Sequence, residues 1–175
     1  MTHAHVLGTA NGAIGASVLF VAEAVGRRGG AVTGVPLTRD ESGKRFERFL
    51  RVAGIERTSC FVTNAVLCNP IDDAGRNRPP TPAEVARCRP FLERTLDIVR
   101  APVVVALGRV ALESLRAVAP HGASLAEHVA APTLWNARTL VPMYHPSRQS
   151  SLHRTEELQI ADWRHLGAIV RGGTT

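Results

Sequence analysis

The chain has 175 residues, 45% of them hydrophobic, a size that suits one buried core and is short for two. Its formal net charge of +6 comes almost entirely from twenty arginines against the single Lys44, and the planar guanidinium of arginine suits phosphate because it donates two parallel hydrogen bonds. The three cysteines are an odd number without paired spacing, and no apolar run approaches the ~20 residues of a membrane span, so we expect a cytoplasmic protein, neither secreted nor membrane-bound.

Short β-branched apolar runs alternate with amphipathic segments along the chain. We predict strands buried on both faces at Val18–Ala22, Cys60–Val66, Val103–Leu107 and Thr139–Met143. We predict helices at Ser42–Ala53, Pro82–Val99, Arg109–Val118 and Glu156–Arg171. Right-handed crossovers between parallel strands then give an α/β fold, a three-layer α/β/α sandwich. A single domain over residues 1–171 is expected, followed by a disordered tail at 172–175.

The helix at Pro82 has the clearest start signal. Thr81 can cap it, Pro82 occupies its first position, and Glu84 can close a capping box. The segment Asp72–Pro80 before it, rich in Gly, Asn and Pro, is predicted to be a loop.

Two side chains with catalytic chemistry stand at the ends of predicted strands. Glu23 follows the first strand, and His145 follows the last. Loops beyond the carboxyl ends of parallel strands line the ligand crevice, so an acid and an imidazole there can share one pocket. The alternatives are a carboxylate paired with Arg27 or Arg28 and a histidine fixed between its loop neighbours.

Asn64 is a polar amide near the end of a buried strand. It must find partners or cost ~1–3 kcal/mol. One acceptor and two donors can accept from uracil N3–H and donate to O4, whereas cytosine presents the opposite pattern. An amide that caps a neighbouring loop is the alternative.

The glycine- and arginine-rich segment Gly26–Gly34 can bring backbone amides close to a phosphate or a base. It matches neither a P-loop nor a dinucleotide fingerprint, because the required glycine spacing is absent. Enzymes with simple nucleotide cofactors are therefore disfavoured. Nucleic acid is the natural partner of this charge, although codon bias and solubility also produce arginine-rich chains.

Taken in order, several motifs resemble those of the uracil-DNA glycosylase superfamily, and in particular its iron-sulfur branch. They are Leu19-Phe20-Val21-Ala22-Glu23-Ala24-Val25-Gly26, Thr63-Asn64-Ala65-Val66-Leu67-Cys68, Arg76-Asn77-Arg78-Pro79-Pro80-Thr81-Pro82-Ala83-Glu84, Cys88-Arg89-Pro90-Phe91-Leu92, Val103 to Arg109, and His145-Pro146-Ser147. The resemblance covers nearly the whole chain.

The resemblance implies a sandwich with a central four-stranded parallel sheet and an enzyme that flips deoxyuridine out of DNA and hydrolyses the base–sugar bond. Asn64 would read uracil, His145 would donate to uracil O2, and Glu23 would orient water or steady the sugar cation. The expected base pocket also includes Ala22, Ala24, Gly26 and Leu37, and the loop expected to enter the minor groove carries Ser147, Arg148, Gln149 and Arg154.

The chain departs from the branch at three places. Ala22 and Val25 replace glycine and proline, and Leu37 replaces an aromatic residue, which forfeits most of the ~1–3 kcal/mol of base stacking unless another ring such as Phe46 substitutes. Cys68 and Cys88 match two of the branch's four cluster ligands, but residues 1–17 hold no cysteine and Cys60 falls within a strand. We therefore expect no metal and no other cofactor, with Cys68 and Cys88 as core residues.

The sequence thus predicts a monomeric uracil-DNA glycosylase acting on uracil-containing DNA. One alternative is a non-catalytic DNA-damage binding protein of the same fold, although a pure binder needs no acid and imidazole at the glycosidic bond. A second is a glycosylase for another deaminated base, hypoxanthine or xanthine, and a third is a variant that traps the sugar covalently.

Overall fold

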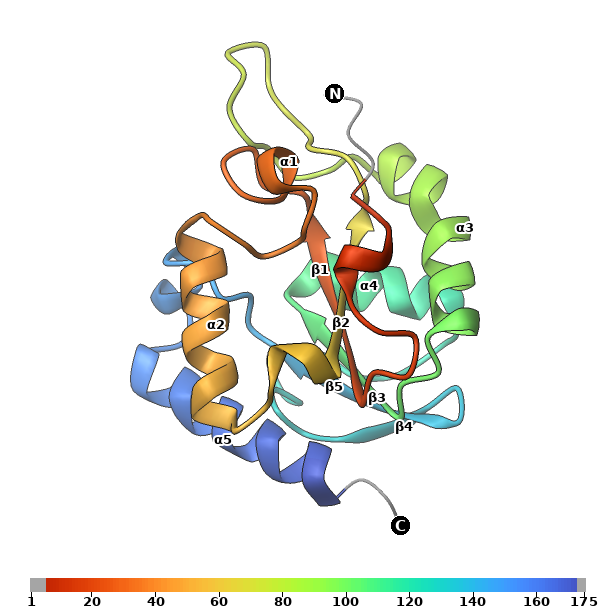
Figure 1. Cartoon of the computed structure of the whole chain (residues 1–175), viewed down its shortest axis with the longest axis vertical. Coiled ribbons are helices and arrows are strands. Elements are labelled where there is room, and N and C mark those ends of the chain that lie inside the picture. Colours follow the sequence, from red (N-terminus) through yellow and green to blue (C-terminus); the bar gives the residue numbers. More distant parts are fainter. Residues whose placement is uncertain (1–5, 173–175) are drawn as a thin grey trace.

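The four predicted strands form the parallel part of one sheet. The computed structural model describes residues 6–172, and within them the sheet order is β2-β1-β3-β5-β4 (Figure 1). The parallel strands are β1 (Val18–Ala24), β2 (Cys60–Val66), β3 (Val103–Leu107) and β5 (Arg138–Met143). A short antiparallel strand, β4 (Thr133–Trp135), extends the sheet at one edge. The predicted four parallel strands are confirmed, and the sheet has a fifth strand in addition.

Helices cover both faces of the sheet, as the sandwich requires. On one face lie α2 (Glu41–Ala53) and α5 (Glu156–Gly172), and on the other lie α3 (Pro82–Ile98) and α4 (Arg109–Val118) (Figure 1). The observed bounds of these helices agree with the predicted ones to within a residue at each end. Gly172, the first residue of the predicted tail, is the last residue of α5, and 173–175 lie outside the described residues.

Alternation along each strand divides the core into two halves. Phe20 and Ala22 point towards α2 and α5, where Phe46 and Trp163 pack against them. Leu19 and Val21 point towards α3 and α4. Since successive strand residues face opposite sides, Glu23 belongs to the α3–α4 side and Asn64, two residues after Val62, to the α2–α5 side.

The predicted start of α3 is confirmed in detail. Thr81 Oγ1 accepts from Glu84 N at 3.2 Å, and Glu84 Oε2 accepts from Thr81 N at 2.8 Å. The same carboxylate receives two hydrogen bonds from Arg78, both 2.8 Å long. These donors hold the pKa of Glu84 down at about 2, with the Arg78 guanidinium as the main cause. The capping box therefore also anchors the loop that precedes the helix.

Several short elements lie between the predicted ones. They are α1 (Gly30–Thr33) and three short 3-10 helices, Thr9–Asn11, Arg57–Ser59 and Gln149–Leu152. Strand β4 joins β5 through a two-residue turn in which Asn136 and Ala137 have φ of 48° and 57°. Such a turn usually carries glycine at its second position, so alanine there hides the hairpin from sequence reasoning. Among residues 6–172, no helix is long and apolar enough to cross a membrane.

Candidate active site at the carboxyl edge of the sheet

A cavity of about 300 Å³, here called the edge cavity, opens beyond the carboxyl ends of the parallel strands. The chain runs from β1 to β2 in one direction and places β3 on the other side of β1, so the strand order reverses beside β1. Ligands of open α/β sheets bind at such a reversal. Four segments wall the edge cavity: the end of β1 with the loop after it, the segment entering α2, the end of β2 with the loop after it, and the loop after β5.

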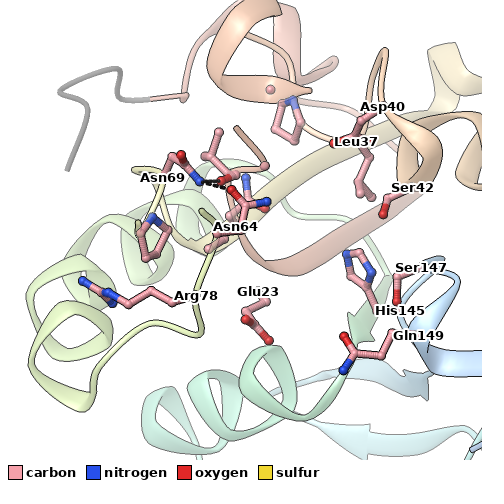
Figure 2. Close-up of a pocket in the computed structure, with 17 residues that line it drawn as sticks. Glu23, Leu37, Asp40, Ser42, Asn64, Asn69, Arg78, His145, Ser147 and Gln149 are labelled. Carbon is pink, nitrogen blue, oxygen red and sulfur yellow. Dashed lines mark hydrogen bonds between the residues drawn. The ribbon is translucent and has the colours of Figure 1, made fainter. Parts of the chain in front are cut away.

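Glu23, Asn64 and His145 all line this one cavity. Figure 2 shows Asn64, Glu23 and His145 at three separate places around the space. Glu23 and Asn64 come from neighbouring strands, where Ala22 pairs with Asn64, and their side chains reach the cavity from opposite faces of the sheet at its edge. The structure thus brings together the three residues that the sequence placed at separate strand ends.

The amide of Asn64 is buried without a hydrogen-bond partner. The residue is 3% exposed, and its Nδ2 is shielded from water and unpaired within residues 6–172. The alternative role as a loop cap is wrong for the described residues, because neither atom of the amide forms a hydrogen bond with a backbone group among them. An unpaired buried donor costs ~1–3 kcal/mol, a cost that a ligand acceptor in the cavity would remove.

His145 is held by the backbone of its own loop. Ser150 Oγ donates to the carbonyl oxygens of His145 and Ser147 at 2.6 and 2.7 Å, and Ser147 N donates to His145 O at 2.8 Å. The imidazole itself has no hydrogen bond to a described residue, and burial lowers its pKa to about 4. The ring is therefore neutral near pH 7 and keeps one N–H to donate.

The backbone conformation behind His145 favours a glycine. Gly108 has φ of 94°, and a Cβ built on it would lie 3.5 Å from His145 Cβ. Its N–H also donates to Met143 O at 2.8 Å, which joins the end of β3 to the end of β5. The backbone of β3 thus supports the loop that carries the imidazole.

Glu23 faces the cavity with its carboxylate free of hydrogen bonds to residues 6–172. Burial raises its pKa, and the positive charge of Arg109 at the start of α4 opposes that rise. The alternative pairing with Arg27 or Arg28 is not formed in the described structure. An unpaired acid that faces a cavity is available to a water molecule or to a cationic centre.

A second amide, Asn69, braces the cavity wall. Its Nδ2 donates to Val25 O at 2.7 Å and to Asn77 Oδ1 at 3.0 Å, and Asn77 Oδ1 also accepts from Arg27 N at 3.3 Å. These bonds tie the loop after β1 to the loop after β2. The sequence predicts a loop here and no site residue within it, although Asn69 beside Pro70 and Asn77 within the predicted loop are polar residues typical of such a role.

The other predicted site residues divide into two groups. Those that line the edge cavity are Ala24, Gly26, Leu37, Ser147 and Gln149. Those that do not line it are Ala22, Arg148 and Arg154.

The residues outside the cavity have identifiable reasons for being there. Ala22 is fully buried and points into the core beneath the cavity, because residues 22 and 23 of a strand face opposite sides. Arg154 donates to both oxygens of Asp162 at 2.5 and 2.7 Å, so its guanidinium is engaged within the protein. Arg148 is exposed on the same loop.

The edge cavity has no Phe, Tyr or Trp side chain in its described lining. Phe46, which could have replaced the missing aromatic residue, is fully buried between Phe20 and Trp163. Leu37 occupies the wall and has φ of 51°, a left-handed conformation that is costly for leucine. A planar ligand in this cavity would contact the aliphatic side chain of Leu37 and no aromatic ring of the described lining.

The cysteines do not fit a four-iron cluster. Burial raises the pKa of Cys68, and so does the charge of Cys88, which therefore lies nearby. The two cysteines are half-buried, so the prediction that they are core residues is wrong. Cys60 begins β2 while Cys68 lies beyond its far end, roughly 25 Å away at ~3.3 Å per residue. A cluster of this kind needs four thiolates, and the sequence holds three cysteines. Among residues 6–172, no group of three or more His, Cys, Asp or Glu is placed to share a metal ion.

Comparison with known proteins identifies relatives of the chain. Residues 9–167 match the family model described as the uracil DNA glycosylase superfamily. The chain is 37% identical over 98 residues to the type-4 uracil-DNA glycosylase of Archaeoglobus fulgidus, covering 56% of this chain and 46% of that protein. It is 33% identical over 131 residues to the type-4 enzyme of Thermotoga maritima, covering 74% and 64%. It is 33% identical over 151 residues to the type-5 uracil-DNA glycosylase of Thermus thermophilus, covering 78% and 67%. The chain thus spans about half to two thirds of the length of these relatives.

Proposed function

Because the chain belongs to the uracil-DNA glycosylase superfamily, we propose that it removes uracil from DNA by hydrolysing the bond between base and sugar. The observation that carries the proposal is the unpaired amide of Asn64, buried in a cavity that also contains Glu23 and His145. A deoxyuridine flipped out of the helix would supply the missing acceptor. Extruding a base costs a few kcal/mol, which interactions of this kind offset.

In the proposed complex, Asn64 reads the edge of the base. Its amide nitrogen donates to uracil O4 and its oxygen accepts from N3–H. Cytosine presents an acceptor at N3 and a donor at C4. The amide oxygen would then face an acceptor and the amide nitrogen a donor, and both contacts are unfavourable. The amide therefore selects uracil against cytosine.

His145 then stabilises the departing base. As the bond breaks, negative charge develops on the uracil oxygens, and a fixed N–H aimed at O2 lowers the energy of that state. The low pKa of His145 means that the ring acts as a neutral hydrogen-bond donor at neutral pH. Its desolvated surroundings strengthen the hydrogen bond, because less water competes for the oxyanion.

Glu23 acts on the sugar side of the same bond. The sugar gains positive charge as the base leaves, and a carboxylate beside it both steadies that charge and orients the attacking water. Arg109 opposes the rise in pKa that burial causes and so favours the ionised acid. The attacking water gives its hydroxyl to the sugar C1′ and its remaining proton ends on uracil N1, so the products are free uracil and an abasic site. Water alone balances this step, and we propose that no cofactor takes part.

We further propose that the protein works as one domain and as a monomer in the cytoplasm. In this proposal Ser147 and Gln149, which line the edge cavity, contact the DNA next to the flipped nucleotide. The aliphatic wall at Leu37 favours testing larger deaminated bases beside uracil.

A labelled oligonucleotide with a single uracil tests the proposal. Treatment with the protein and then with alkali should cut the strand at the uracil, and Glu23→Gln, Asn64→Ala and His145→Ala should each slow the cut by roughly 100- to 1000-fold. Parallel substrates carry hypoxanthine or xanthine. Binding without strand cutting would instead favour the damage-binding alternative, and full activity in all three variants would remove the site assignment.

A further inference from the structure

Eight of the twenty arginines form an ion pair within the described residues. Ion pairs join Arg45 and Arg48 to Glu156, Arg78 to Glu84, Arg116 to Glu113, and Arg154 to Asp162. Beside the edge cavity, three arginines without an ion pair to any described residue line one hollow. Arg27, Arg28 and Arg39, here called the arginine cluster, are exposed, and none of them forms an ion pair with a residue in the described range 6–172.

The cluster surrounds a surface hollow that adjoins the edge cavity. Arg27 and Arg28 follow β1, and Arg39 precedes α2, yet all three line the same hollow. Asp40 lines both this hollow and the edge cavity, so the two openings are neighbours. A strand whose base entered the edge cavity would carry its phosphates past the cluster.

Close packing fixes the cluster in place. A Cβ on Gly29 would overlap Asp40 Oδ2 and would lie 2.8 Å from Thr38 O, so the turn that carries Arg27 and Arg28 presses directly on the segment before α2. Asp40 Oδ1 in turn accepts from Gly43 N at 2.9 Å and caps the helix. The backbone that carries the three arginines is therefore held in place by this packing.

The backbone between the two openings is strained. Leu37 and Arg39 have φ of 51° and 69°, a left-handed region that residues other than glycine and asparagine rarely adopt. Such outliers gather at functional sites, where the surrounding structure holds them. Here the strained segment places Leu37 in the edge cavity and Arg39 in the hollow.

The acids in the hollow do not cancel its positive charge. Asp40 is occupied as a helix cap, and Glu41 pairs with Lys44 at 3.0 Å. Counting these two acids, Lys44 and the cluster leaves the surface with two positive charges. A phosphate is the ligand that this chemistry favours, because a guanidinium can donate two parallel hydrogen bonds to it.

We propose that the arginine cluster binds the phosphates of the DNA strand that carries the flipped nucleotide. The inference rests on the proposed function and adds to it the surface that supplies electrostatic affinity. Arg154 is not part of that surface, because its guanidinium is held by Asp162. Phosphate contacts orient the duplex without reading its sequence, so the cluster should act on every DNA equally.

The test compares two triple variants that lose the same charge. The cluster variant is Arg27→Gln, Arg28→Gln and Arg39→Asn, with asparagine chosen because it tolerates the left-handed backbone. The control variant is Arg51→Gln, Arg87→Gln and Arg94→Gln, three exposed arginines on α2 and α3 that form no ion pair within the described residues. Binding of a fluorescent duplex with thymine at the test position is measured against salt, and excision is measured on the matching uracil duplex.

Near 0.1 M salt, the cluster variant should bind the thymine duplex about tenfold more weakly for each phosphate that it no longer holds. The slope of log affinity against log salt should be smaller by about 0.9 for each of these phosphates. Its KM for uracil DNA should rise while kcat stays near the wild-type value, and the control variant should match wild type in slope. If the triple variant fails to fold, Arg28→Gln alone should show the change expected for one phosphate.

A cluster variant with the wild-type slope and affinity, or a control variant that weakens binding as much, would overturn the proposal. The thymine duplex separates this outcome from a failure of the proposed function. A wild-type protein that binds DNA through the cluster but releases no uracil would refute uracil excision and leave the phosphate surface standing.

Discussion

Replacing Asn64 by leucine should make the protein more stable and nearly inactive. Leucine has nearly the shape of asparagine, and the residue is 3% exposed with an unpaired Nδ2. Removing that unpaired donor should raise the free energy of unfolding by about 1–3 kcal/mol. In a chain of this length each kcal/mol corresponds to roughly 2–4 °C in Tm. Uracil excision should fall by about 100-fold or more, because leucine cannot form the amide's hydrogen bonds with the base.

Asn11 provides a matched control. It is 2% exposed, but its amide is fully used, donating to Val62 O at 2.7 Å and accepting from Gly8 N at 3.0 Å. Asn11→Leu should therefore lower the free energy of unfolding by about 1–3 kcal/mol, opposite in sign to Asn64→Leu. Thermal denaturation and the uracil oligonucleotide assay measure both effects. A fall in Tm for Asn64→Leu comparable to that of Asn11→Leu would refute the reasoning, since it would mean that Asn64 holds the fold together.

Three further predictions concern His145, Gly167 and Arg154. Because burial lowers the pKa of His145 from 6.5 to about 4, the unfolded chain binds a proton in that window that the folded chain excludes, and the free energy of unfolding falls as the pH drops through it. His145→Asn should flatten this fall between pH 6.5 and 4 in melting experiments, and an unchanged pH profile would contradict the assignment. Gly167→Ala should destabilise the protein by about 1–3 kcal/mol, because its Cβ would overlap the carbonyl oxygen of Ala53 in α2, whereas Gly122→Ala meets nothing within 4 Å and should not. Arg154→Gln should lower Tm, because it leaves a buried carboxylate of α5 unpaired, while Arg148→Gln should leave Tm unchanged; equal melting of the two variants would count against the internal pairing.

The bounds of the main helices and strands could be predicted from the sequence to within one or two residues, because apolar runs and capping residues mark them locally. The apolar run at Cys60–Val66 is a strand with the predicted bounds, and Thr81, Pro82 and Glu84 start α3 as their spacing indicates. Buried parallel strands need continuous apolar runs, and helix starts need caps, so both leave marks in a few consecutive residues. Glu23 lies within β1, which runs two residues past its predicted end, and His145 follows β5 as predicted, so both side chains still reach the carboxyl edge of the sheet.

Other features depended on interactions between distant segments. Arg154 looked like a phosphate ligand in its basic loop, but Asp162 on α5 holds it. Arg39 was unremarkable in the sequence, yet packing against the turn after β1 puts it beside Arg27 and Arg28. Which arginines remain available for DNA is decided by which acids the fold brings near them.

The sequence by itself determined the layers of the sandwich, the strand ends and the chemical types gathered there, because these follow from the periodicity and capping of short segments. Only the tertiary structure decided that Asn64 lacks a partner within the described residues, that Ala22 lies under the cavity floor and that Phe46 is buried in the core. The physical reason is that hydrogen-bond partners, strand faces and ion pairs are set by neighbours that are far away along the chain.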